Sequence, residues 1–162
     1  KIWSARINEI AGSPELWPVF VKPVEDKQFT GVVVNSPKDL IGAGIYGQNQ
    51  PVLCSEVVNF VSECRCFVRY GRILDVRHYR GDWRVRPAPA TIERAVRDFT
   101  TAPAGYAIDF GLTDKGETLL IEVNDGYSLG CYGLVYLDYA KLLSARWAEL
   151  TGTTDECAFD IY

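Results

Sequence analysis

The stretch from Tyr106 to Gly126 restricts the fold more than any other part of the sequence, because two apolar runs flank a short polar segment. Residues 106–112 and 118–124 have the composition of β-strands, and the sequence TDKG between them has the residues of a turn. The stretch therefore predicts an antiparallel β-hairpin.

Three oxygen-bearing side chains of this hairpin are predicted to share one face. They are Asp109, Glu122 and Asn124. Side chains alternate between faces along a strand, and a four-residue turn at 113–116 brings the three within diagonal reach. Two carboxylates and an amide oxygen suit a hard cation such as Mg2+. The alternative is a polar, solvent-facing ribbon, although Asp and Asn are disfavoured within strands.

This interpretation depends on the register of the hairpin. A four-residue turn predicts that Leu112 lies opposite Glu117 and that Asp109 lies opposite Leu120. The remaining apolar side chains then form a core face: Ile108, Phe110, Ile121 and Val123. A turn one residue longer or shorter would move Asp109 to the other face.

The composition describes an ordinary globular protein. The chain has 162 residues, of which 48% are hydrophobic and 23% charged, enough for one domain or two small lobes. A net charge of -4 argues against nucleic acid as the partner, and no apolar run reaches membrane-spanning length. Five cysteines without a C-x-x-C pair suit free thiols in a reducing cytosol, so we expect a cytoplasmic protein. Because the chain begins at Lys1 and contains no methionine, we expect a fragment of a longer product.

The remaining periodicities predict both helices and strands, in an order typical of an α+β fold with meandering antiparallel strands. Helices are expected at 1–11, from Ser36, at 90–101 and at 134–150, and strands at 17–24, 31–35, 51–60, 63–70 and 73–79. The last helix is expected to bury an apolar stripe: Tyr136, Ala140, Leu143, Trp147 and Leu150.

A second predicted hairpin places two arginines face to face. With a turn around Gly71, Arg65 lies directly opposite Arg77, beside Glu63 and Asp75. Like charges in this position repel each other unless an anion or flanking carboxylates separate them. The pair is therefore either part of a surface salt-bridge lattice or a clamp for charge that develops during phosphoryl transfer.

One lysine lies inside an apolar strand, in the sequence VFVKPV. Lys22 either reaches past the edge of the sheet into solvent or directs a fixed ammonium group at a phosphate. The sequence EDKQFTG that follows is typical of a flexible loop that covers phosphates with backbone N–H groups, but it does not match the P-loop pattern.

In their order along the chain, these segments resemble the ATP-grasp family, and within it the clade named for two arginines and one lysine. The resemblance runs from Val19 to Leu134 through VFVKP, KQFTG, LCSEVV, ECRCFV, DVRHY, AIDFGLT and LIEVNDG. No single motif is decisive, but the ordered combination is specific. It implies an α+β fold in which two lobes with mostly antiparallel sheets, at residues 1–55 and 56–162, close on a nucleotide. The metal site would then belong to the second lobe.

The resemblance also implies roles for individual residues. The catalytic groups would be Lys22, Arg65 and Arg77. The nucleotide would be bound by a phosphate-covering loop, a hinge and their neighbours: Lys22, Lys27, Thr30, Gly31, Glu56, Val58 and Glu63. The Mg2+ ligands would be Asp109, Glu122 and Asn124.

The activity implied by this family is ATP- and Mg2+-dependent ligation of a carboxylate to an amine or a thiol through an acyl phosphate. The substrate would be a small molecule or a peptide carboxylate with an amine acceptor. A non-catalytic ATP-binding module, a kinase and a nucleotidyltransferase are the alternatives. Family members generally carry a preceding domain that helps to hold the acceptor, and little of this chain precedes Val19.

Overall fold

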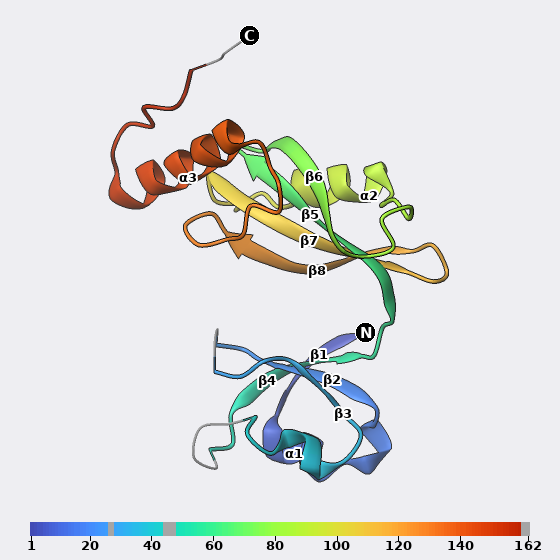
Figure 1. Cartoon of the computed structure of the whole chain (residues 1–162). Helices are drawn as coiled ribbons and strands as arrows, with labels where there is room; N and C mark the ends of the chain where they lie inside the picture. The colour runs from blue at the N-terminus through green and yellow to red at the C-terminus, as the bar shows by residue number, and fades with distance from the viewer. Residues whose placement is uncertain (26–27, 44–47, 160–162) are drawn as a thin grey trace. The chain divides into compact units, whose positions relative to one another are not determined.

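The computed structural model describes residues 1–25, 28–43 and 48–159 (Figure 1). The chain divides into two compact units, Lys1–Val58 and Asn59–Tyr162. Each unit contains one four-stranded antiparallel sheet together with helical segments. The fold is therefore α+β, as the sequence predicts.

The first unit is built on a sheet with the strand order β1-β4-β2-β3. Its strands are β1 (Ile2–Arg6), β2 (Val19–Pro23), β3 (Val32–Val34) and β4 (Pro51–Glu56). Helix α1 (Ile7–Ala11) follows β1, and two short 3-10 turns, η1 (Pro14–Leu16) and η2 (Pro37–Leu40), lie in the connections. The core combines strand and helix side chains: Ile7, Ile10, Val19, Val21, Val34, Leu40, Ala43, Val52 and Cys54.

The helix predicted for residues 1–11 is wrong in its first half, where β1 pairs antiparallel with β4. Trp3 and Ala5 face the core and their neighbours face outwards, so burial alternates with the period of a strand. Only Ile7 and Ile10 keep helical spacing toward the core. The spacing of Trp3, Ile7 and Ile10 fits both structures, and pairing with β4 decides between them.

The second unit is built on a sheet with the strand order β6-β5-β7-β8 and has two helices (Figure 1). Its strands are β5 (Phe60–Arg69), β6 (Arg72–Gly81), β7 (Gly105–Thr113) and β8 (Thr118–Asp125). Helix α2 (Pro89–Asp98) packs on one face, over Cys64, Cys66 and Ile108. Helix α3 (Tyr136–Thr151) packs on the other face, over Phe67 and Ala107. The sheet therefore has two distinct faces, and the candidate site lies on the α3 face.

The apolar stripe predicted for the last helix is not its buried face. Leu142, Ala145 and Ala148 are buried, whereas Tyr136 and Trp147 are 85% and 66% exposed. A Cβ on Gly105 would lie 2.3 Å from the carbonyl oxygen of Leu142, so α3 lies directly against the β7 backbone. Small residues permit this close approach, and the large apolar residues of the helix point away from it.

The hairpin of β7 and β8 has a shorter turn than predicted. The Thr113 N–H donates to the carbonyl oxygen of Glu117 over 2.9 Å, so only the residues 114–116 form the turn. Leu112 consequently lies opposite Thr118, and the predicted pairings with Glu117 and of Asp109 with Leu120 are wrong. Val123 is also 43% exposed rather than part of a core face, because β8 is an edge strand.

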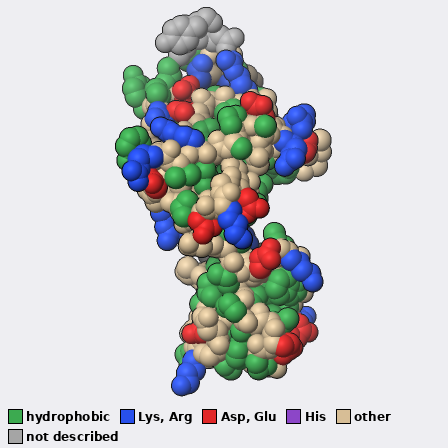
Figure 2. Space-filling view, turned by 90° about the vertical axis from the view of Figure 1, so that its right-hand side faces the viewer, with side chains coloured by type: hydrophobic (Ala, Val, Ile, Leu, Met, Phe, Trp, Pro, Cys, Tyr) green, Lys and Arg blue, Asp and Glu red, His purple; other side chains and the backbone are tan. Residues whose placement is uncertain are grey.

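The surface carries both signs of charge. On the face shown in Figure 2, Lys and Arg side chains lie among Asp and Glu side chains and do not form one continuous basic area. All five cysteines are free, as predicted. Across the described ranges, none of the helices is both long and apolar enough to cross a membrane.

Candidate functional site

A buried ion pair joins β5 to β7 on the α3 face of the second unit. Arg65 Nε and Nη2 donate to the two carboxylate oxygens of Asp109, each over 2.7 Å, and the side chains are only 6% and 3% exposed. Burial alone would lower the pKa of the Arg65 guanidinium, but the hydrogen bonds and charge of Asp109 raise it overall. Both groups therefore stay ionised in a place with little water.

Arg77 lies directly opposite Arg65 on the neighbouring strand β6, as the sequence predicts. Its Nε is 2.8 Å from a carboxylate oxygen of Asp75. Glu63 does not take part in this pairing, because it accepts hydrogen bonds from Tyr79 and from Arg80. Each arginine of the facing pair thus has its own carboxylate, which relieves their repulsion.

The structure brings together the three predicted metal ligands. Asn124 Nδ2 lies 3.3 Å from Asp109 Oδ2 and 3.5 Å from Glu122 Oε1. A β-bulge makes this possible, because Phe110 pairs with Leu120 whereas Asp109 pairs with Glu122. The unpaired Ile121 shifts the register by one residue, which compensates for the turn that is one residue shorter than predicted.

These donors differ in how well they fit a hard cation. Glu122 is exposed, and in the described parts of the chain no Lys or Arg forms an ion pair with it. Asn124 donates through its nitrogen, so its amide oxygen is free to bind a cation. Asp109 already accepts two hydrogen bonds from Arg65, so it has less capacity left. Glu122 and Asn124 thus fit Mg2+ as ligands, and Asp109 would serve both Arg65 and the metal.

An aromatic stack covers this ion pair. The Tyr132 ring is stacked on the Tyr79 ring with centroids 4.7 Å apart, and the Arg65 guanidinium carbon lies 4.7 Å from the Tyr132 centroid. Arg65 Nη1 also donates to the carbonyl oxygen of Gly130 over 3.4 Å. Burial, the nearby Asp109 charge and the hydrogen bond to Glu63 all raise the pKa of Tyr79, so its hydroxyl stays neutral. The only signal in the sequence for this stack is the glycine- and tyrosine-rich segment DGYSLGCYG.

The other predicted phosphate contacts belong to the first unit. Lys22 lies on β2 opposite Leu53 and is half-buried. Thr30 is exposed and directly precedes Gly31. A Cβ on Gly31 would lie 2.5 Å from the ring of Phe20, which explains the glycine there. Lys27 lies outside the described residues.

The predicted hinge residues lie where the two units join in sequence. Glu56 ends β4, and its carboxylate contacts the α-amino group of Lys1. Val58 is half-buried in the connection before β5. Lys22, Thr30, Gly31, Glu56 and Val58 therefore belong to the first unit, whereas Glu63, both arginines and the metal ligands belong to the second.

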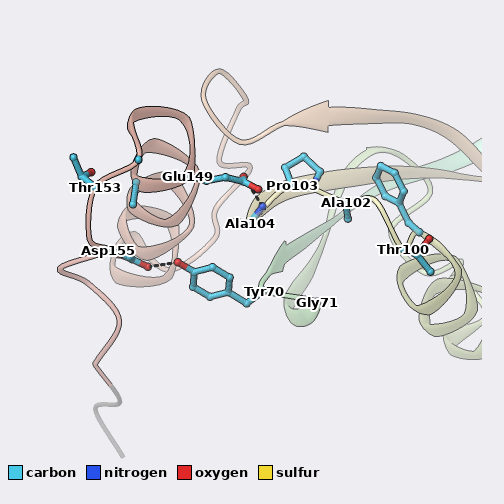
Figure 3. A pocket seen from close by; sticks show the side chains of 12 residues that line it. Tyr70, Gly71, Thr100, Ala102, Pro103, Ala104, Glu149, Thr153 and Asp155 are labelled. Carbon is cyan, nitrogen blue, oxygen red and sulfur yellow. Dashed lines mark hydrogen bonds between the residues drawn. The ribbon is translucent and has the colours of Figure 1, made fainter.

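The largest hollow of the second unit lies elsewhere, beside the end of α3 (Figure 3). Its volume is about 620 Å³, and its walls include Tyr70, Pro103, Glu149 and Asp155. The acidic groups are already engaged, since Asp155 accepts from Tyr70 over 2.9 Å and Glu149 from the Ala104 N–H over 2.8 Å. Tyr70 is five residues beyond Arg65, roughly 16 Å along an extended strand. This hollow is therefore not part of the candidate site.

Comparison with solved structures identifies the fold. The ADP complex of PurK, an N5-carboxyaminoimidazole ribonucleotide synthetase, superposes with a TM-score of 0.61 at 15% identity, over 90% of this chain and 46% of that one. D-alanine–D-alanine ligase from Bacillus anthracis gives 0.58 at 16% identity, over 91% and 60%. The ATP-grasp ligase PsnB with a minimal precursor gives 0.54 at 15% identity, over 76% and 45%. The chain thus spans about half the length of these proteins.

No curated protein matches the sequence significantly. Residues 1–142 match the ATP-grasp domain family that is the second in the clade named for two arginines and one lysine, and the match covers both sheets and the aromatic stack. The order of motifs, the two facing arginines on β5 and β6 and the two antiparallel sheets agree with that match. The chain therefore belongs to the ATP-grasp family, as a member of the second family of this clade.

Proposed function

We propose that this chain binds ATP and Mg2+ and forms the catalytic part of a ligase that joins a carboxylate to an amine or a thiol. The observation that carries the proposal is the cluster on the α3 face of the second sheet. Two arginines face each other there, and Glu122 and Asn124 adjoin the Arg65–Asp109 pair. Phosphoryl transfer needs positive charge and hard oxygen ligands in one place, and this cluster contains both.

Arg65 has a defined part in this proposal. A guanidinium has five N–H groups, and three of them bind Asp109 and the Gly130 carbonyl. The remaining two would bind oxygens of the transferred phosphoryl group. Arg77 is more exposed and would bind the same charge from β6. The charge that develops on these oxygens would be stabilised without reorganisation of Arg65, because Asp109 already fixes it.

The metal would be held by Glu122 and Asn124, with Asp109 shared between metal and arginine. Bound Mg2+ would supply positive charge beside the phosphate oxygens of the nucleotide. With these groups in place, a carboxylate oxygen would attack the terminal phosphorus with loss of ADP. An amine or thiol would then attack the acyl carbon, releasing phosphate and a proton.

The first unit would complete the nucleotide site. Lys22 would contact phosphates, the segment of Thr30 and Gly31 would cover them with backbone N–H groups, and Glu56 and Val58 would form the adenine-side hinge. Glu63 would bind the ribose. In this proposal, residues 1–55 and 56–162 are two lobes that close on the nucleotide, and Lys27 belongs to the loop between β2 and β3.

The relatives support the choice of ligands. Structures of PurK with ADP and of PsnB with Mg, ADP and a minimal precursor exist. We therefore propose a peptide or amino acid carboxylate as the substrate of this chain, with an amine as the acceptor. The free thiols favour a reducing compartment such as the cytoplasm.

Ligand-induced stabilisation tests the proposal. ADP and AMPPNP should raise the melting temperature of the chain only when Mg2+ is present, because a ligand stabilises the state that binds it. Glu122→Gln should abolish this increase without changing the melting temperature of the free protein, since Glu122 is exposed. Glu93→Gln, on the exposed side of α2, is the matched control and should keep the increase. Equal stabilisation in EDTA, or in Glu122→Gln, would rule out the proposed metal site.

Product analysis separates the possible reactions. A ligase yields ADP, phosphate and a ligated product, whereas a nucleotidyltransferase yields AMP or pyrophosphate and a kinase yields a phosphorylated substrate. Tight ATP binding without any of these products across panels of carboxylates and amines would identify a non-catalytic module instead.

A further inference from the structure

We infer that Tyr132 is a positioning residue that fixes the plane of the Arg65 guanidinium, and this inference rests on the function proposed above. Tyr132 lies in the segment between β8 and α3, outside the sheet that carries the arginine. It contributes no hydrogen bond to the cluster of predicted ligands in the described structure. Its ring, however, is the group that covers the guanidinium face.

The first observation is the order of the stack. The Tyr132 ring lies between two groups from different strands: the ring of Tyr79 on β6, at 4.7 Å and an interplanar angle of 18°, and the guanidinium of Arg65 on β5, at 4.7 Å. An arginine stacked on an aromatic face gains cation–π attraction, which increases as water is excluded. Arg65 is buried, so this contact is well shielded.

The second observation is the backbone of Tyr132. Its φ angle is +42°, in the left-handed region that bulky residues rarely adopt, and Gly133 follows with a φ of +81°. Such a conformation persists only where the surroundings hold it. Here the surroundings are the two stacked groups and the hydrogen bond from Arg65 to Gly130, which lies just before Tyr132 in the chain. The segment thus keeps an unfavourable backbone conformation in order to place this ring.

The two neighbours of Arg65 constrain it in different ways. Asp109 holds one edge of the guanidinium through two parallel hydrogen bonds. The Tyr132 ring lies against its face and limits rotation of the plane about that edge. Together they fix the direction of the two N–H groups that remain free. A catalytic cation that is already oriented stabilises developing charge better than one that must reorient.

Two substitutions separate positioning from simple packing. Tyr132→Leu removes the ring, whereas Tyr132→Phe keeps it and removes only a hydroxyl that forms no hydrogen bond with other described residues. Tyr132→Gly is a second ring-free variant that suits the left-handed backbone, so it remains informative if Tyr132→Leu folds poorly. Tyr136→Leu is the matched control, because this tyrosine is exposed and lies four residues further along.

The first readout needs no nucleotide. The side-chain Nε–H signal of Arg65 in NMR spectra reports how tightly the guanidinium is held, through its exchange with solvent. We expect at least about tenfold faster exchange in the two ring-free variants and unchanged exchange in Tyr132→Phe and Tyr136→Leu. Unchanged exchange without the ring would overturn the inference.

The second readout is ATP turnover. Without the ring, kcat should fall about tenfold or more while KM for ATP changes less than about threefold, because misplacement of a catalytic group affects the chemical step. Tyr132→Phe should restore kcat, and an equal loss in Tyr132→Phe would contradict a role for the ring. If the unmodified chain neither binds nor turns over ATP, the proposed function fails, but the NMR experiment still decides whether Tyr132 holds Arg65.

Discussion

The guanidinium of Arg65 and the carboxylate of Asp109 lie edge to edge across β5 and β7, joined by two hydrogen bonds of 2.7 Å. Removal of one partner would leave the other charge buried without compensation. Asp109→Asn should therefore destabilise the second unit by about 3 kcal/mol. Amide hydrogen exchange of the β7 strand measures this loss directly.

A double substitution provides the control for this prediction. Replacing both partners by apolar residues, as in Arg65→Met with Asp109→Leu, removes the unpaired charge and should recover much of the lost stability. The interpretation would be wrong if the double variant were less stable than Asp109→Asn, or if Asp109→Asn had no effect.

Arg77 should behave in the opposite way. The side chains of Arg77 and Asp75 are 37% and 35% exposed, so their ion pair contributes at most about 1 kcal/mol to stability. If Arg77 binds the transferred phosphoryl group, Arg77→Gln should reduce ATP turnover about 100-fold while the protein stays folded. Arg72→Gln, an exposed arginine on the same strand, is the control in denaturation and turnover assays. Equal turnover in both variants would exclude the proposed role.

The C-terminal segment should detach from the second unit in acid. Burial by itself raises the pKa of Asp155, but hydrogen bonds from Ser144, Tyr70 and Arg69 lower it overall below its ordinary value of 3.8. The stabilisation is therefore complete above pH 3.8 and is lost as the pH falls through the lower folded-state value. Protection of the Cys157 N–H, which donates to Asp155, should fall in this range. In Asp155→Asn, protection should be low at every pH; a flat profile in the unmodified protein would disprove the effect.

Two glycines beside the candidate site should respond differently to alanine. A Cβ on Gly126 would lie 2.2 Å from the carbonyl oxygen of Gly105, so Gly126→Ala should cost about 2 kcal/mol. A Cβ on Gly130 would lie 3.6 Å from the ring of Tyr132, an ordinary contact, and Gly130→Ala should stay within about 0.5 kcal/mol. Urea denaturation of both variants checks the difference, and similar midpoints would contradict it.

Much of the architecture could be predicted from the sequence, because its hairpins depend on local patterns. Alternation and turn residues locate both hairpins of the second unit, and they place Arg65 opposite Arg77. Helix α2 also follows from its apolar spacing, with Ile92 and Val96 buried. These features depend on neighbours that are close in the sequence, so the sequence alone suffices.

The remainder depends on packing between distant segments. The spacing of Trp3 and Ile7 suits a helix, but Ile2–Arg6 pairs with β4. In α3 the largest apolar residues look like the buried stripe, yet the small Ala145 and Ala148 are buried because the backbone of β7 lies close to the helix. Periodicity shows that a face is apolar, but not which neighbour can reach it.

The candidate site was only partly accessible to sequence reasoning. Alternation along the strands indicates that Asp109, Glu122 and Asn124 share a face, and the structure brings them together by a different register. The stack of Tyr79 and Tyr132 could not be predicted, because it depends on the path of the segment after β8. Which of these residues bind nucleotide or metal stays a prediction.

The bulge at Ile121 means that β8 contains one residue more than its pairing with β7 requires. Deletion of that residue would leave a regular ladder with Glu122 still opposite Asp109, and the exposed residues 114–116 can change in number without altering the pairs beyond the bulge. The hairpin is therefore open to length variation at two places. Related chains can differ in length there and keep the same wall of ligands, so motif spacing counted along the sequence is a poorer guide to this site than motif order.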